Sequence, residues 1–185
     1  MAKMSNNNAT HGIRGKVNQF VYRQRYGETV VSKPPIRTAP FSEEQKNIVA
    51  TFKQAVLYAR SVLQDALIRK AYKQKAKKGQ SAFNLAIADF FKPPTIEMVD
   101  LSQLTNQAGS IIRVMVTDNF RVESVKVTIE QSDGRMLEQG DAVLQSDGLH
   151  WHYTTTTAEG NNAGNKLSII ATDLPGHSIT EQQTI

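Results

Sequence analysis

The hydrophobic period of this 185-residue chain changes once, at Pro93-Pro94, and that change limits the folds open to it. Before the two prolines, apolar residues recur at steps of three and four, which indicates amphipathic helices. After them, apolar and polar residues alternate, which indicates strands with one buried face. Separate blocks of helix and strand patterns predict an α+β protein with more than one domain.

The helical block is predicted to contain two helices. Ser42 and Gln45 form a capping-box pattern at the start of the first helix. Its apolar stripe consists of Ile48, Phe52, Ala55, Val56, Ala59, Val62, Leu63, Ala66 and Leu67. This stripe predicts one long helix that ends at about residue 76. Ser81 caps a shorter helix that stops at Pro93, so the two helices are expected to form an αα-hairpin.

The strand block is predicted to be an antiparallel β-sandwich. Its alternating positions are Ile112, Val114 and Val116, then Val125, Val127 and Ile129, then Leu167, Ile169 and Ala171. Turn residues such as Asp133-Gly134 and Asp147-Gly148 separate these runs, and about seven short strands so spaced are typical of a sandwich. Trp151 is the only tryptophan and is predicted to lie in the core. His150 and His152 are expected on the opposite strand face.

Three stretches of this block, 109-GSIIRVMVTDNFRVESVKVTI-129, 151-WHYTTTT-157 and 167-LSIIATDLPGHS-178, resemble bacterial immunoglobulin-like domains. The resemblance covers residues 95–185. It implies an Ig-like fold but no particular function, because such sandwiches serve many roles.

The N-terminal part, 16-KVNQFVYRQRYGETVVSKPP-35, predicts a basic β-hairpin with its turn at Tyr26-Gly27. On one continuous first strand, Val17 and Val21 would share a face, and Phe20 and Tyr22 would share the other. An isolated two-stranded hairpin is marginal in water, so it must pack on this chain or on another.

These patterns divide the chain into three predicted segments. A flexible arm is expected over residues 1–15, a hairpin and helical domain over residues 16–93, and the sandwich over residues 94–185.

The charged residues are unevenly distributed between the two halves of the chain. Residues 1–92 carry a net charge of +12 and residues 93–185 a net charge of −7, for a total of +5. Such a split indicates modules with different partners, or head-to-tail contact between copies.

The sequence shows no motif that predicts catalysis, a cofactor or a small-molecule substrate. The chain has no cysteine, so a disulfide framework and thiolate chemistry are excluded. No G-x-S-x-G, P-loop or G-x-G-x-x-G pattern is present. We therefore predict that the protein is not an enzyme.

The sequence offers two candidate metal sites. His150 and His152 could supply two zinc ligands, but the spacing identifies no third, and we interpret them as an outward-facing polar pair. The aspartates near predicted turns are Asp118, Asp133, Asp141, Asp147 and Asp173. They are compatible with calcium between loops or with ordinary turn hydrogen bonds, and we expect no calcium requirement for folding.

A basic tract, 69-RKAYKQKAKK-78, favours nucleic acid as an alternative partner. Its cations are Arg69, Lys70, Lys73, Lys75, Lys77 and Lys78. Tyr22, Tyr26 and Tyr72 are available to stack on bases in this interpretation. The other interpretation is a solvated helix end, where lysines are common.

The opening 12-GIRGKVNQFVYRQRYGETVVSKPP-35, followed by 42-SEEQ-45, resembles small uncharacterised proteins of bacterial genomes and phage-like gene clusters. The resemblance covers residues 12–60. It implies a virion-type or other assembly component that is associated with a capsid or tail. The hairpin residues proposed to contact a protein partner or a second copy are Val17, Phe20, Tyr22, Arg23, Arg25, Tyr26, Val30 and Val31.

The expected location follows from the absence of two patterns. The first 12 residues lack the apolar run of a secretory signal, and no stretch approaches the roughly 18 apolar residues of a membrane span. We expect a protein made in the cytoplasm and assembled into a virion or similar particle, with no membrane partner. A cell-surface adhesion module is a third alternative, which the missing signal does not favour.

Overall fold

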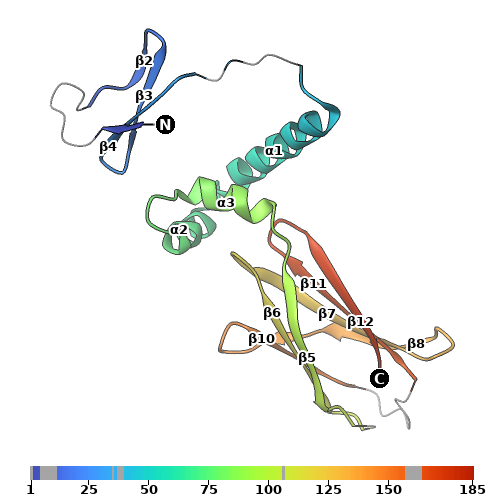
Figure 1. The fold of residues 1–185 in the computed structure, drawn as a ribbon. Coiled ribbons are helices and arrows are strands. Elements are labelled where there is room, and N and C mark those ends of the chain that lie inside the picture. Colours follow the sequence, from blue (N-terminus) through green and yellow to red (C-terminus); the bar gives the residue numbers. More distant parts are fainter. Residues whose placement is uncertain (1, 5–11, 35, 37–39, 106, 157–163) are drawn as a thin grey trace. The chain divides into compact units, whose positions relative to one another are not determined.

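The computed structural model describes the chain except for residues 1, 5–11, 35, 37–39, 106 and 157–163, and it forms two compact units (Figure 1). The first unit contains residues 1–51 and the second contains residues 52–185. Helices and antiparallel sheets are both present, as the α+β prediction requires. The predicted boundary at residues 93 and 94 differs from this division, because the helices after residue 52 pack with the sandwich.

The first unit contains one four-stranded antiparallel sheet with the order β1-β4-β3-β2. The strands are β1 (Ala2–Met4), β2 (Gly15–Val17), β3 (Phe20–Arg25) and β4 (Glu28–Ser32). The predicted hairpin is therefore the centre of a larger sheet. Two parts of the predicted arm lie in strands, since β1 pairs with β4 and Gly15 begins β2.

Two tight turns shape this sheet. At the predicted turn, Tyr26 has φ 51° and Gly27 has φ 86°, and Arg25 lies opposite Glu28. Positive φ at both central residues is the type I′ geometry that suits two-residue hairpins. A second turn at Asn18, with φ 53°, brings Val17 opposite Phe20. Asparagine tolerates this backbone region better than most residues.

The prediction of one continuous strand through residues 17–22 was therefore wrong. The turn at Asn18 reverses the chain, so Val17 lies on the same face as Phe20 and Tyr22 and not with Val21. Directly opposed residues of an antiparallel pair share a face.

Three helices follow the sheet: α1 (Glu43–Val62), α2 (Ala66–Lys75) and α3 (Ala82–Phe90). The capping box is confirmed, since the Ser42 N–H donates to Gln45 Oε1 and the Gln45 N–H donates to Ser42 Oγ, each at 3.2 Å. Ser81 caps α3 as predicted, and its Oγ accepts from the Asn84 N–H.

The prediction of a single long helix to residue 76 was wrong, because α1 ends at Val62 and α2 begins after Asp65. The Asp65 carboxylate accepts hydrogen bonds from the N–H groups of Leu67 and Ile68, at 2.7 and 3.1 Å. This side chain satisfies backbone donors at a new helix start, which competes with continuation of α1.

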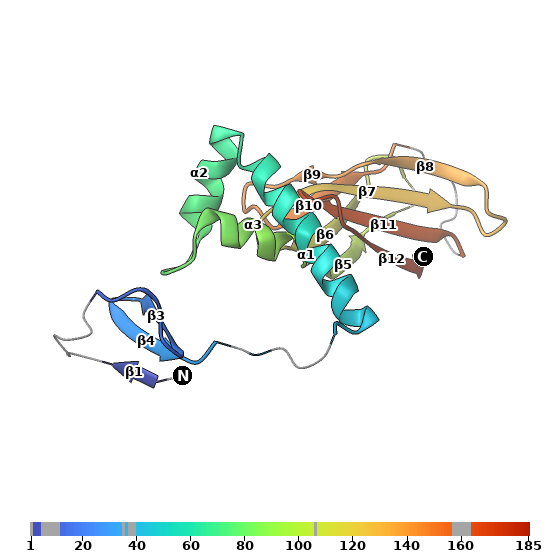
Figure 2. The same ribbon diagram turned by 90° about the horizontal axis from the view of Figure 1, so that it is seen from above.

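The second unit also contains a β-sandwich of two four-stranded antiparallel sheets (Figures 1 and 2). One sheet has the order β5-β6-β10-β9 and the other has the order β12-β11-β7-β8. The first sheet contains β5 (Thr95–Gln103), β6 (Ile111–Thr117), β10 (His150–Thr154) and β9 (Val143–Leu144). The second contains β12 (Ser178–Thr184), β11 (Lys166–Asp173), β7 (Val122–Glu130) and β8 (Met136–Asp141).

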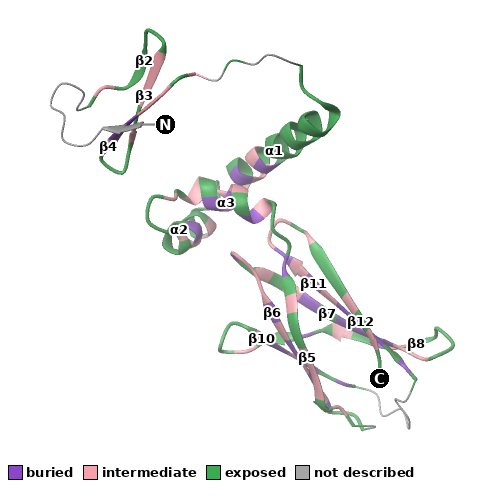
Figure 3. Ribbon diagram, viewed as in Figure 1, coloured by how far each residue is buried: buried purple, intermediate pink, exposed green. Residues whose placement is uncertain are grey.

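The sandwich core consists of the alternating positions expected from the sequence, which are buried along β6, β7 and β11 (Figure 3). Trp151 and Tyr153 complete this core from β10. The prediction that Trp151 is buried is confirmed, and His150 and His152 lie on the other face. No helix in the described part of the chain is both long and apolar enough to cross a membrane.

Candidate interaction surfaces

The register of the N-terminal sheet places one group of apolar side chains and one group of cations on opposite faces. Val17 lies opposite Phe20, and Tyr22 lies opposite Val31, so these four side chains share one face. We call them the apolar face. Its members differ in exposure: Val17 is 51% exposed, whereas the other three are half-buried.

The opposite face of the sheet carries cations. Lys16 lies opposite Val21, Arg23 opposite Val30, and Arg25 opposite Glu28. We call Lys16, Arg23 and Arg25 the basic face, and all three are exposed. The proposed contact residues therefore do not form one patch, because Arg23 and Arg25 point away from Phe20 and Tyr22.

Two proposed contact residues differ in how far a partner could reach them. Tyr26 is 79% exposed at the tip of the β3–β4 turn, whereas Val30 is only 8% exposed. Among the described residues of β2–β4, only Thr29 and Val30 are buried. Strands β2–β4 therefore bury too few side chains to form a complete hydrophobic core, which needs a second packed layer.

The basic tract lies on α2 and just after it. Arg69, Lys70 and Lys73 are exposed and share a helix face, since residues three and four apart are neighbours there. Lys77 and Lys78 follow the helix and are also exposed.

Lys75 differs from the other cations of the tract. Its Nζ donates to the Phe120 carbonyl oxygen at 2.5 Å and lies 5.8 Å from the centre of the Phe120 ring. Its ammonium group therefore contributes to the contact between α2 and the β6–β7 connection, and it is not available to a nucleic acid in the same way as the others.

A buried polar cluster joins the helices to the sandwich. Phe120 projects from the β6–β7 connection and stacks on Tyr72 of α2, with ring centroids 3.6 Å apart and planes 9° apart. The Tyr72 hydroxyl donates to Asp89 Oδ2 at 2.6 Å and lies 3.0 Å from the Tyr58 hydroxyl. Tyr72 and Asp89 are both fully buried.

This junction extends to the end of β11. The ring of Phe90 meets the His177 imidazole edge-on, with centroids 5.4 Å apart. Asp173 accepts from the His177 backbone N–H at 2.6 Å, and His177 Nδ1 lies 3.1 Å from its other oxygen. The prediction that Tyr72 is available to stack on bases is wrong, because Tyr72 is fully buried.

The His150 and His152 pair lines a shallow hollow of about 300 Å³ on the β5-β6-β10-β9 sheet. His150 Nδ1 lies 2.6 Å from Asp147 Oδ2. Backbone N–H groups of His150 and Leu149 hold the pKa of Asp147 at about 2, below its usual value. Among the described residues, no three histidine, cysteine, aspartate or glutamate side chains are arranged to hold a metal ion.

Four of the five aspartates weighed as calcium ligands make turn hydrogen bonds. Asp118, Asp133 and Asp147 each accept from a backbone N–H two residues later, and Asp173 accepts from one four residues later. This is the ordinary turn chemistry of aspartate.

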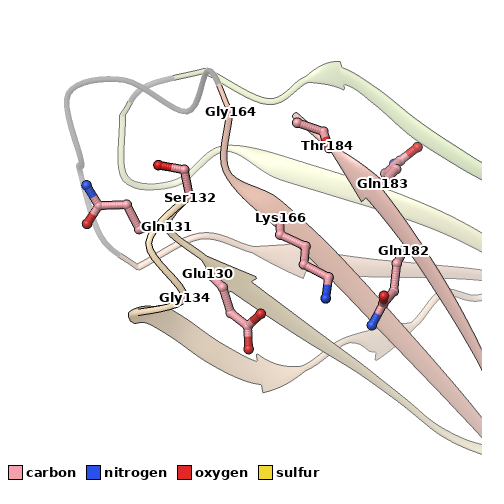
Figure 4. A pocket seen from close by; sticks show the side chains of 9 residues that line it. All are labelled: Glu130, Gln131, Ser132, Gly134, Gly164, Lys166, Gln182, Gln183 and Thr184. Carbon is pink, nitrogen blue, oxygen red and sulfur yellow. The ribbon is translucent and has the colours of Figure 1, made fainter.

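A second hollow of about 380 Å³ lies on the β12-β11-β7-β8 sheet, where β7 and β12 end and β11 begins (Figure 4). Its wall is polar: Lys166 lies opposite Glu130 in register, and Gln182 and Gln183 come from β12. Charged, amide and hydroxyl side chains line this hollow.

Comparison with known proteins gives no family for the chain. No protein-family model matches it, and no curated protein matches it in sequence. The solved structures with weak similarity to this chain include two proteins. One is an engineered protein from the Northeast Structural Genomics Consortium, with 17% identity and a TM-score of 0.35, covering 60% of this chain and 29% of that one.

The other is the pullulanase SAP of Group B Streptococcus, with 18% identity and a TM-score of 0.29. It covers 40% of this chain and 10% of that one. The chain thus spans less than a third of either protein's length. At these TM-scores, neither similarity supports an argument about function.

Proposed function

We propose that the protein is a non-enzymatic structural component of a larger assembly, of the capsid- or tail-associated kind found in phage-like particles. The N-terminal sheet attaches it, and the sandwich is presented to other surfaces. The observation that carries this proposal is the two-faced sheet, with an apolar face and a basic face and only Thr29 and Val30 buried in β2–β4.

Physical reasons favour a protein as the partner of this sheet. Tyrosine, phenylalanine and arginine are enriched in protein interfaces, and all three lie on β3. An exposed apolar surface on a small folded unit usually marks a contact site. The basic face favours an acidic partner surface, and a second copy of this chain offers one, because residues 93–185 carry a net charge of −7.

Deletion of residues 1–33 tests this proposal. The shortened protein should lose self-association and capture by products of neighbouring genes, while residues 52–185 keep their fold. Light scattering and native mass spectrometry measure the assembly, and circular dichroism measures the fold. If the shortened protein assembles as well as the full chain, the sheet is not the attachment site.

We further propose that the sandwich is immunoglobulin-like. Strands β5, β6, β10 and β9 follow the A-B-E-D order of one Ig sheet, and β7, β11 and β12 follow the C-F-G order of the other. Strand β8 then extends the second sheet next to β7. An experimental structure in which these strands were connected differently would contradict this assignment.

A second candidate function is nucleic-acid binding through the basic tract. The observation that favours it is that Arg69, Lys70, Lys73, Lys77 and Lys78 are exposed and make no ion pair among the described residues. Binding through phosphates weakens steeply with salt, with a log–log slope of about −0.9 per phosphate contacted.

The salt dependence decides between the two candidates. We expect only weak binding of duplex or single strands, and only at low salt. Micromolar or tighter affinity at about 150 mM salt, reduced by Lys73→Gln and Lys77→Gln but not by Lys166→Gln, would favour the nucleic-acid function instead.

A further inference from the structure

We propose that Asp89 and Tyr72 form a proton-dependent latch between the helices and the sandwich, closed when the Asp89 carboxyl is protonated and weakened when it is ionised. The proposal concerns residues 52–185 and is independent of the proposed assembly function.

The geometry places a carboxyl group where water does not reach it. Asp89 lies on α3 and is fully buried, and its Oδ2 accepts from the Tyr72 hydroxyl at 2.6 Å. Its Oδ1 has no hydrogen-bond partner among the described residues. A buried, ionised carboxylate with one satisfied oxygen is costly, and a proton removes most of that cost.

Other acceptor oxygens on the sandwich side of the junction also lack partners. Asp118 Oδ1 and Asn119 Oδ1, in the β6–β7 connection, are also buried without partners. A neutral carboxyl can donate as well as accept, so protonation of Asp89 adds a donor to a junction that contains unpartnered acceptors.

The net effect of burial and of the charged and titratable groups around Asp89 is to raise its pKa. Burial, helped by the negative charges of Asp118 and Asp173, raises the pKa of Asp89 to about 6, although the Tyr72 hydrogen bond and the Lys75 ammonium lower it. Burial also raises the pKa of Tyr58 to about 12, and the pKa of Tyr72 is raised. Both hydroxyls therefore keep their protons when Asp89 titrates.

The latch spans the two layers because Tyr72 has contacts on both sides. Its hydroxyl reaches Asp89 on α3, and its ring stacks on Phe120 from the sandwich. Lys75 of the same helix holds the Phe120 carbonyl. Ionisation of Asp89 should therefore weaken the packing of α2 on the sandwich through Tyr72.

The sign of the pH effect follows from the raised pKa. A carboxyl whose pKa is about 6 in the closed form and near the ordinary 3.8 in an opened one binds more protons when closed. Its stabilising contribution is complete below pH 3.8 and is lost as the pH rises through about 6. The junction should therefore be tighter in mild acid than at neutral pH.

Hydrogen exchange on the full chain measures this effect directly. Between about pH 5 and about pH 7.5, amides of α2 and α3 should lose about tenfold in protection after correction for intrinsic rates. Core amides of β7 and β11 should not change. Asp89→Asn keeps an acceptor for Tyr72 but cannot ionise, so its helices should stay protected at both pH values.

Two further measurements test whether Asp89 itself causes the pH effect and do not depend on the folding of Asp89→Asn. His177→Gln should keep the pH effect, which separates Asp89 from the histidine at the same junction. Carbon-13 titration of the wild-type Asp89 carboxyl should give a midpoint near 6. A midpoint near 4, a pH effect that persists in Asp89→Asn, or a loss at pH 7.5 that millimolar calcium reverses would each overturn the latch.

Discussion

Trp151 shows how strongly the exposure of a side chain depends on the place of its strand in the sheet, because β10 is an inner strand and β9 is an edge strand. Trp151 is 7% exposed, whereas Leu144, which lies opposite it on β9, is 45% exposed. Trp151 packs among the residues of both sheets in the sandwich core. Removing its indole leaves a cavity that the rigid strands around it cannot fill.

We therefore expect Trp151→Ala to lower the free energy of unfolding by about 3–5 kcal/mol. Leu144→Ala, the control on the paired strand, should cost less than about 1 kcal/mol. Urea unfolding followed by circular dichroism measures both. Equal losses from the two variants would mean that Trp151 is not a core residue in solution.

The contrast between Trp151 and Tyr72 shows which residues can be placed from sequence. The burial of Trp151 is predictable because successive side chains of a strand point to opposite faces. Tyr72 is not, because its ring and hydroxyl are used by Phe120 and Asp89, which lie far along the chain. No local spacing relates these three residues, and the cations beside Tyr72 gave it the appearance of a surface position.

At the scale of elements, the helices show the same limit. Both N-caps at Ser42 and Ser81 were predictable, because the pattern and the contact are local. The break between α1 and α2 was not, because the apolar stripe continues across it at helical spacing. Only the short polar side chain of Asp65 marks the new start.

Asp65→Ala should lower the free energy of unfolding by about 1 kcal/mol, the usual value of an N-cap side chain. The Gln64→Ala variant, one residue earlier, is the control and should change stability much less. Thermal unfolding of both proteins measures the difference. An unchanged melting temperature for Asp65→Ala would show that α2 does not depend on this cap.

The sandwich as an element should fold without the helices. All twelve buried residues of its core lie between residues 112 and 171, so residues 95–185 hold their own core. Phe120, Leu174 and His177 would lose their helical contacts. The fragment should give a dispersed amide spectrum with shifts confined to these loops. A soluble fragment without dispersion would contradict the predicted boundary at Pro93-Pro94.

At the scale of the whole molecule, the sequence predicted an α+β chain with a sandwich, but not how the N-terminal strands are arranged. The turn at Asn18 moves Val17 to the face of Phe20 and Tyr22. That single reversal gathers the apolar face on one side of the sheet and leaves the basic face, together with Val21 and Val30, on the other. The proposed attachment function depends on this arrangement.

Sedimentation velocity of the full chain over a concentration series, alone and with products of neighbouring genes, tests that function most directly. We predict association for the wild type, its loss in the apolar-face variant Val17→Ser, and salt-sensitive weakening in the basic-face variant Arg23→Gln. The exposed sandwich variant Met136→Ser is the control and should associate normally. A wild-type protein that stays monomeric and binds none of these partners would contradict the account.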